Sequence, residues 1–175
     1  MKFCLSALIV CFWLFYPGAI HAYDISLHDT PVNVYFSPRG GAQQAIVDVI
    51  GQAKATIYVQ AYSFTSAPIA KALVDASRRG VKVEALLDKS QRKATYTGAT
   101  FLKNEGIPVW IDDKHAIAHN KVMILDGDMV ITGSFNFTKA AEEKNAENLL
   151  IIRDAGLAII YLTNFRQHQN HSVVF

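Results

Sequence analysis

The chain has 175 residues, of which 51% are apolar, and a formal net charge of +2 at pH 7, which fits one domain of ordinary size. A charge this close to neutral, with no polybasic run, gives no support to nucleic-acid binding through net charge alone. Both cysteines, Cys4 and Cys11, lie in the first 22 residues. Removal of that segment would exclude a disulfide scaffold, a zinc–thiolate site, an iron–sulfur cluster and a cysteine nucleophile.

The N-terminus has the layout of an export signal. Lys2 precedes a run over residues 3–16 with a single polar position, and the small Ala22 stands where a signal peptidase could cut. We predict that residues 1–22 are a signal peptide and that residues 23–175 form the mature domain. The mature protein would be exported to the periplasm or beyond, without stable membrane association. An uncleaved anchor is the alternative, but the run is shorter than the roughly 20 residues that span a bilayer.

The rest of the sequence alternates between apolar strands and amphipathic helices. The predicted strands are 32–36, 55–62, 81–87, 107–111, 121–125, 129–132 and 147–153. The predicted helices are 42–53, 67–79, a short helix ending near 104, and 156–169. Strands that alternate with helices favour βαβ units, whereas the Asp126-Gly127 turn favours an antiparallel hairpin. We therefore predict one α/β domain, a mixed and partly parallel sheet with helices on both faces.

Polar side chains gather at the ends of two predicted strands. His119 and Lys121 stand two residues apart, so their side chains share one face of a strand, and the same holds for Ser134 and Asn136. Two adjacent strands would thus place an imidazole, an ammonium, a hydroxyl and a carboxamide around one point. This set holds a nucleophile and several donors but no carboxylate, which suits an anion such as a phosphate.

The spacing of these residues resembles the HKD motif of the phospholipase D superfamily. The matching residues are His119, Lys121, Asp126, Gly133, Ser134 and Asn136, with Asn145–Asn148 as the acidic element that follows the motif. The small size, the signal and the single motif make the chain most similar to the small secreted bacterial Nuc-type endonucleases. The resemblance implies a phospholipase D-like fold and a nuclease that cleaves DNA, and possibly RNA, with little sequence specificity.

The resemblance also implies a mechanism without a metal or other cofactor. His119 would attack phosphorus and form a phosphohistidine, which water would then release. The departing alkoxide is a poor leaving group and needs a general acid, which in this family is the histidine of a second motif. No other histidine of this chain has a lysine two residues on. The resemblance therefore implies a homodimer that shares one active site across its two-fold axis.

Further roles follow from the resemblance. Lys121 and Asn136 would clamp the non-bridging oxygens and stabilise the pentavalent transition state. Ser134 would hydrogen-bond a phosphate oxygen or hold His119. Glu147 would accept the second imidazole N–H of His119 and so set its tautomer.

Several residues have a second interpretation. Asp126 would orient the strands or the motif lysine, or it is simply part of the turn. His115 and His119 stand four apart and invite a zinc hypothesis, but no third ligand is evident, so we predict no metal site. His168 and His171 are predicted to be surface residues of the last helix.

The substrate class is open at this stage. Lys89, Arg92, Lys93, Tyr62 and Tyr96 lie in or near predicted loops and favour a groove for a nucleic-acid backbone, although a solvated loop explains them equally well. A lipid phosphodiesterase is the enzymatic alternative, and it should show an exposed apolar lip or amphipathic surface helix. The other alternative is a non-catalytic phosphate- or nucleic-acid-binding module, which would not need a nucleophile with an orienting carboxylate.

Overall fold

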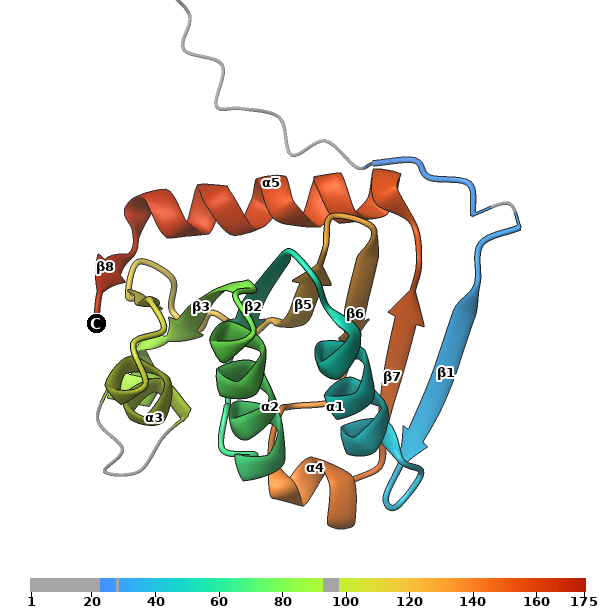
Figure 1. Cartoon of the computed structure of the whole chain (residues 1–175), viewed down its shortest axis with the longest axis horizontal. Coiled ribbons are helices and arrows are strands. Elements are labelled where there is room, and N and C mark those ends of the chain that lie inside the picture. The colour runs from blue at the N-terminus through green and yellow to red at the C-terminus, as the bar shows by residue number, and fades with distance from the viewer. Residues whose placement is uncertain (1–22, 28, 93–97) are drawn as a thin grey trace, which may run out of the picture.

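Eight strands form one mixed sheet in the order β1-β7-β6-β5-β2-β3-β4-β8 (Figure 1). The computed structural model describes residues 23–27, 29–92 and 98–175, so the predicted signal at 1–22 lies outside it. The strands are β1 (Val32–Ser37), β2 (Thr56–Ala61), β3 (Lys82–Asp88), β4 (Val109–Asp112), β5 (Lys121–Leu125), β6 (Met129–Gly133), β7 (Glu147–Ile152) and β8 (Val173–Val174). The helices are α1 (Ala42–Gln52), α2 (Ala67–Arg78), the 3-10 turn η1 (Lys89–Arg92), α3 (Gly98–Asn104), α4 (Lys139–Glu143) and α5 (Ala155–His171).

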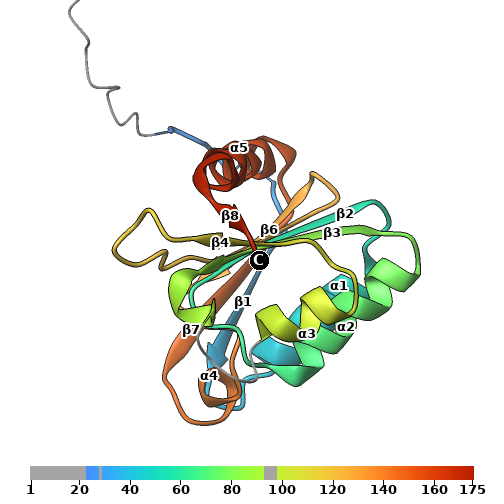
Figure 2. The same ribbon diagram turned by 90° about the vertical axis from the view of Figure 1, so that its left-hand side faces the viewer.

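The sheet combines parallel and antiparallel pairs, as predicted. β2, β3 and β4 run parallel and are joined through α2 and α3, whereas β5, β6 and β7 pair antiparallel with their neighbours. Figure 2 shows α5 on one face of the sheet and α1, α2 and α3 on the other. The predicted α/β class, with one mixed sheet between helices, is confirmed.

Apolar side chains on the two faces of the strands build two cores. Alternate residues of a strand point to opposite faces, so Ile57 and Val59 of β2 pack toward α1 and α2, while Tyr58 packs toward α5. Phe165 of α5 fills the second core, and its ring centroid lies 5.3 Å from that of Tyr58. Within the described ranges, no helix is long and apolar enough to span a membrane.

Three short elements were not predicted from the sequence: the 3-10 turn η1, the helix α4 and the strand β8. The five-residue helix α4 is too short for an amphipathic pattern, and its start is fixed locally by Thr138, whose hydroxyl accepts the Ala141 N–H at 3.1 Å. The two-residue strand β8 pairs antiparallel with β4 directly after α5 ends. Such a strand exists because tertiary pairing supplies its hydrogen bonds, and local sequence carries no signal for it.

Candidate active site

The predicted motif residues meet at one edge of the sheet. β2, β3 and β4 end at this edge, β5 and β7 begin there, and β6 ends there. The register pairs Ala61 with Lys121 and Gly133 with Leu149, which brings the starts of β5 and β7 beside the ends of β2 and β6. The carboxyl ends of parallel strands are the usual place for a site in an α/β sheet.

His119 presents an exposed imidazole just before β5. Its ring lies on the ring of Tyr62, with centroids 4.7 Å apart at an angle of 51°. The backbone N–H of Tyr62 donates to the carbonyl of Asn120 at 2.8 Å, which fixes the aromatic ring beside the histidine. Among the described residues, the His119 imidazole has no hydrogen-bond partner, so both of its nitrogens are available to a ligand.

Lys121 is the buried cation of this edge. The residue is only 7% exposed, and its Nζ donates to the carbonyl of His119 at 2.9 Å and lies 5.3 Å from the centre of the Tyr62 ring. Burial lowers the pKa of the Lys121 ammonium, and the negative charge of Glu147 partly opposes that shift. An ammonium has three N–H donors, so one hydrogen bond to protein leaves two for a substrate anion.

The turn after β6 is built around Gly133. Its φ of 147° is unfavourable for other residues, and a Cβ there would lie 2.3 Å from the carbonyl oxygen of Asn148. Ser134 uses its hydroxyl oxygen to accept from the backbone N and side-chain Nδ2 of Asn148, at 3.0 and 3.3 Å. Asn136 has a buried Oδ1 without a partner in the described part of the chain. Ser134 thus ties β6 to β7, whereas Asn136 would contact an anion through its Nδ2 N–H groups and not through Oδ1.

Glu147 lies close to Lys121 but does not make the contact expected of it. Its Oε1 accepts from Asn145 Nδ2 at 3.1 Å, and its charge acts on Lys121. The predicted hydrogen bond from the imidazole of His119 is not formed among the described residues. Within one chain, Glu147 therefore acts on the charge of the site rather than on the histidine tautomer.

Asp126 lies at the other end of β5, roughly 16 Å from Lys121 at 3.3 Å per residue. Its carboxylate accepts from the backbone N–H groups of Lys54, Ala55 and Thr56 at 2.9, 2.8 and 3.0 Å. Burial raises the pKa of the Asp126 carboxyl, but these backbone donors outweigh it and hold the pKa below its usual value. Asp126 fastens the β5–β6 turn to the start of β2, so it orients strands and does not contact Lys121.

Asp88 positions the active-site loop, and the sequence analysis missed it. This buried residue ends β3, and its Oδ2 accepts from the backbone N–H of Ala118 at 2.8 Å, next to His119. Burial raises the pKa of the Asp88 carboxyl, but hydrogen bonds from Ser90 and Ala118 bring it below the usual value. The sequence signal for this role was an aspartate at the carboxyl end of a predicted apolar strand.

The predicted substrate-binding cations also hold this loop. Lys89 donates from Nζ to the carbonyl of His115 at 3.0 Å, and Arg92 forms an ion pair with Asp113 at 3.6 Å. Both side chains lie at the surface beside the loop that carries the motif histidine. Lys93 and Tyr96 lie outside the described residues.

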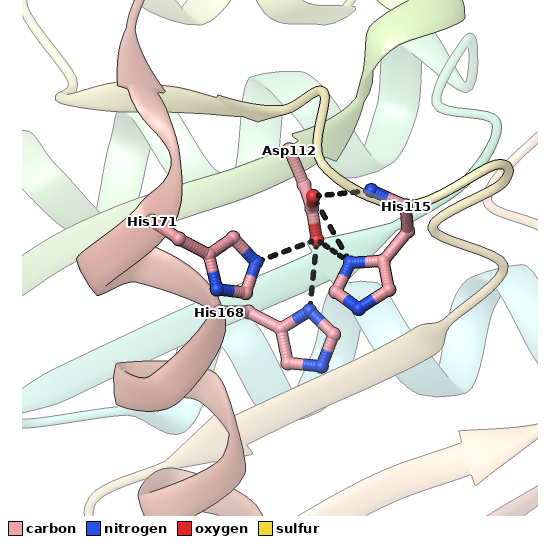
Figure 3. A group of neighbouring side chains, drawn as sticks. All are labelled: Asp112, His115, His168 and His171. Carbon is pink, nitrogen blue, oxygen red and sulfur yellow. Dashed lines mark hydrogen bonds and ion pairs between the residues drawn. The ribbon is translucent and has the colours of Figure 1, made fainter.

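A second histidine cluster corrects the prediction that His168 and His171 are surface residues. His168 and His171 are not free surface residues of α5, because both imidazoles point to the buried carboxylate of Asp112, as does that of His115 (Figure 3). His115 therefore belongs with these residues and not with His119. Burial raises the pKa of the Asp112 carboxyl, but hydrogen bonds from the three histidines outweigh it and hold the pKa well below its ordinary range.

Comparison with known proteins identifies the family. A family model described as "Cardiolipin synthase, PLD-like domain" matches residues 46–169. A phospholipase D from Rickettsia bellii is 45% identical over 150 residues, which cover 85% of this chain and 75% of the relative. A mitochondrial cardiolipin hydrolase from Xenopus laevis is 30% identical over 70% of this chain and 58% of that protein.

Solved structures give the same result. Nuc from Salmonella typhimurium, a phospholipase D family member, superposes with a TM-score of 0.79 at 38% identity, over 84% of this chain and 99% of Nuc. NucT from Helicobacter pylori has a TM-score of 0.78 at 24% identity, over 84% of this chain and all of NucT, which supports the fold alone. The family model spans well over half of the chain, and the motif residues meet at one edge of the matching fold. This chain is therefore a phosphodiesterase that belongs to the phospholipase D superfamily.

Proposed function

We propose that the protein is a metal-independent nuclease that cleaves phosphodiesters through His119, with an active site shared by two copies of the chain. One observation carries the proposal: the exposed imidazole of His119, which has no hydrogen bond to any described residue, lies beside a buried ammonium on the same aromatic ring. The imidazole is free to act as a nucleophile, and the ammonium can hold the anion that it attacks.

The reaction proceeds in two displacements. A ring nitrogen of His119 attacks phosphorus, a N–P bond forms, and the P–O bond to the leaving group breaks. The alkoxide takes a proton from the imidazolium of His119 of a second copy. Water then attacks the phosphohistidine and gives that imidazole a proton, which releases a phosphate monoester and restores both histidines.

Donors at the same edge lower the barrier. Lys121 has two N–H groups left for non-bridging oxygens, and the Nδ2 of Asn136 carries two further N–H donors. The charge that develops on phosphorus is stabilised by such fixed donors, and the loss of one typically costs roughly 3 kcal/mol of barrier. Two copies of this set, related by symmetry, would surround the phosphate.

An uncovered apolar strip offers the surface for the second copy. Val32, Val34 and Phe36 point away from the core side chain Tyr35, onto the sheet face that carries α5. Helix α5 packs on β2 to β6, and Phe36 is 67% exposed. Phe36 pairs with Asn148, the residue that binds Ser134, so the strip ends beside the candidate active site. Burial of this strip against its own copy would bring two motifs together.

Nucleic acid is the substrate we favour. Lys89 and Arg92 lie on the surface beside the loop of His119, and Tyr62 offers a ring for stacking. Cations and aromatic rings suit a phosphate backbone that is bound without base readout. The likeness to Nuc supports this choice. A lipid diester is the second candidate, because the Rickettsia relatives at 45–46% identity are named phospholipase D.

The test is cleavage of plasmid DNA by purified mature protein in excess EDTA, beside a His119→Asn variant. The proposal predicts cleavage in EDTA that the variant lacks. Equal activity in the variant would overturn the role of His119. Loss of activity in EDTA by a folded His168→Ala/His171→Ala variant, which lacks the second histidine cluster, would overturn the metal-independent mechanism. Vesicles that contain phosphatidylglycerol form the second arm, and product from vesicles alone would replace the nuclease by a lipid phosphodiesterase.

We also propose that the chain is exported and cleaved near Ala22. The argument is the charged, apolar and small-residue pattern of residues 1–22. Expression of the full chain in a bacterium with two membranes, followed by mass measurement of the periplasmic protein, tests the proposal. A mature mass that begins near residue 23 is expected, and uncleaved protein in the membrane fraction would overturn it.

A further inference from the structure

We propose that Asp112, His115, His168 and His171 form a binding site for one divalent transition-metal ion, with Zn²⁺ the best fit. One carboxylate oxygen and three imidazole nitrogens lie within 4.8 Å of one another (Figure 3). They come from three places in the chain: the end of β4, the loop after it and the last turn of α5. Among the described residues, this is the one group of side chains with that ligand geometry.

The distances suit tetrahedral coordination. The Nδ1 atoms of His115 and His168 lie 2.9 and 2.8 Å from Asp112 Oδ2, and Nε2 of His171 lies 3.4 Å from it. Bonds of about 2.0–2.1 Å in a tetrahedron place ligand atoms roughly 3.3 Å apart. The nitrogen–oxygen distances already bracket that value. The four ligand atoms lie within 4.8 Å of one another, so binding would draw the imidazole nitrogens closer together around the ion.

The donor set selects the kind of metal. Three imidazoles and one carboxylate suit zinc and neighbouring transition metals, whereas Mg²⁺ and Ca²⁺ prefer oxygen ligands. Four protein ligands would close the coordination sphere, which is typical of a structural site. The Asp112 side chain is fully buried and the side chains of His168 and His171 are 18% and 24% exposed, whereas that of His115 is 44% exposed, so the site is shielded at Asp112 and open at His115.

The carboxylate is already oriented for this role. Asp112 Oδ1 accepts from the backbone N–H groups of Lys114 and His115 at 3.2 and 3.4 Å and lies 3.1 Å from Nδ1 of His115, while Oδ2 faces all three imidazoles. Outer hydrogen bonds of this kind orient the ligands of metal sites. The alternative to a metal site is a cluster held by hydrogen bonds alone. In that cluster, positively charged imidazoles would also be stabilised by the C-terminal end of helix α5.

A bound ion would join distant parts of the chain. Asp112 and His168 are 56 residues apart, so the ion would hold the end of α5, and β8 behind it, against β4. His115 lies four residues before His119 in the same loop. The ion would thus brace the loop that carries the proposed nucleophile while it takes no part in the reaction.

Titration of metal-free, full-length mature protein with Zn²⁺ alone tests the inference. We expect one ion per chain by calorimetry, and a rise in Tm of about 5 to 10 °C when free Zn²⁺ reaches 100 times its Kd. The His168→Ala/His171→Ala double variant should lose both effects. The matched control is His119→Asn, which removes the histidine outside the cluster and should keep them.

A conservative variant and a spectroscopic probe distinguish the loss of a metal ligand from the loss of the fold. Asp112→Asn retains the shape of the side chain but weakens the metal ligand, and Co²⁺ absorbance reports tetrahedral coordination directly. We expect the tetrahedral spectrum with the native chain and its loss in Asp112→Asn. Absence of Zn²⁺ uptake by the native chain, uptake that survives the double variant, or uptake that depends on His119 would each overturn the inference. None of these outcomes depends on phosphodiester cleavage.

Discussion

The loop before β5 carries both His115 and His119, but their imidazoles have very different surroundings. The imidazole of His119 is exposed and has no hydrogen bond among the described residues, and its closest ring contact is Tyr62. The imidazoles of His115, His168 and His171 instead converge on the buried carboxylate of Asp112. In our proposals, the first region is one half of a site that two copies share, whereas the second region holds all its ligands within one chain.

The difference shows what each arrangement can do. An imidazole nitrogen that points to a carboxylate binds either that oxygen or an ion between them. It is therefore poorly placed to attack phosphorus. An imidazole without a partner, beside an ammonium with unused donors, is available to a substrate. The neighbours of each ring therefore decide what each histidine can do, and substitutions in the two regions should have different effects.

The largest expected effect is that of His119→Asn. Removal of the proposed nucleophile should lower kcat for phosphodiester cleavage by at least roughly 10³-fold, because the covalent route through His119 would be lost. The His168→Ala variant, assayed below its unfolding transition, should keep activity near that of the native chain. A comparable loss in both variants would contradict the division between the two regions.

Substitution of the buried cation should have the next largest effect. Lys121→Met keeps the volume of the side chain but removes the ammonium that we place on the phosphate. We expect kcat to fall by about 10²- to 10³-fold, as for the loss of a fixed donor in other transition states. Steady-state kinetics on a chromogenic phosphodiester checks this. A loss below tenfold would remove Lys121 from the mechanism.

The lowered pKa of Lys121 predicts a pH effect with a definite sign. The active form is the protonated ammonium, and burial favours the neutral amine, so activity should fall on the alkaline side at a pH below the ordinary lysine pKa of 10.5. Lys121→Arg gives the control, since arginine keeps its charge throughout this range. The alkaline decline should move to higher pH in that variant, and an unchanged profile would contradict the assignment.

The smallest expected effect on chemistry is at the far end of β5. Asp126→Asn should lower the free energy of unfolding by about 1–2 kcal/mol, because the carboxylate accepts three backbone N–H groups. The pKa of this carboxyl is held below its unfolded value, so its contribution is present above pH 3.8 and is lost as pH falls through the folded pKa. Urea unfolding with a parallel kcat measurement checks both parts. A fall in kcat without loss of stability would contradict this interpretation and indicate that Asp126 acts in the active site.

The sequence predicted the fold well because periodic apolar runs determine most of it. The mixed sheet and the long helices follow from side-chain alternation and from the Asp126-Gly127 turn. The short elements α4 and β8 were missed, since α4 rests on a local Thr138 cap and β8 on pairing with β4. Neither leaves a periodic pattern in the sequence.

The two histidine regions were not equally predictable. His119, Lys121 and the turn at Gly133 lie within about 15 residues on paired strands, so strand alternation brings them together. The second cluster depends on packing of the end of α5 beside Asp112, over 56 residues of chain. The spacing of His168 and His171 on one helix face was its local signal, but the carboxylate that they share is visible only in the fold.

The shared active site is tested most directly by mixing native and His119→Asn chains, unfolded and refolded together in equal amounts. If each site needs His119 from both copies, only native pairs act, and activity falls to about one quarter of that of an equal amount of all-native chains. If each chain acts alone, about one half remains. A value near one quarter supports the two-copy site, and a value near one half would contradict it.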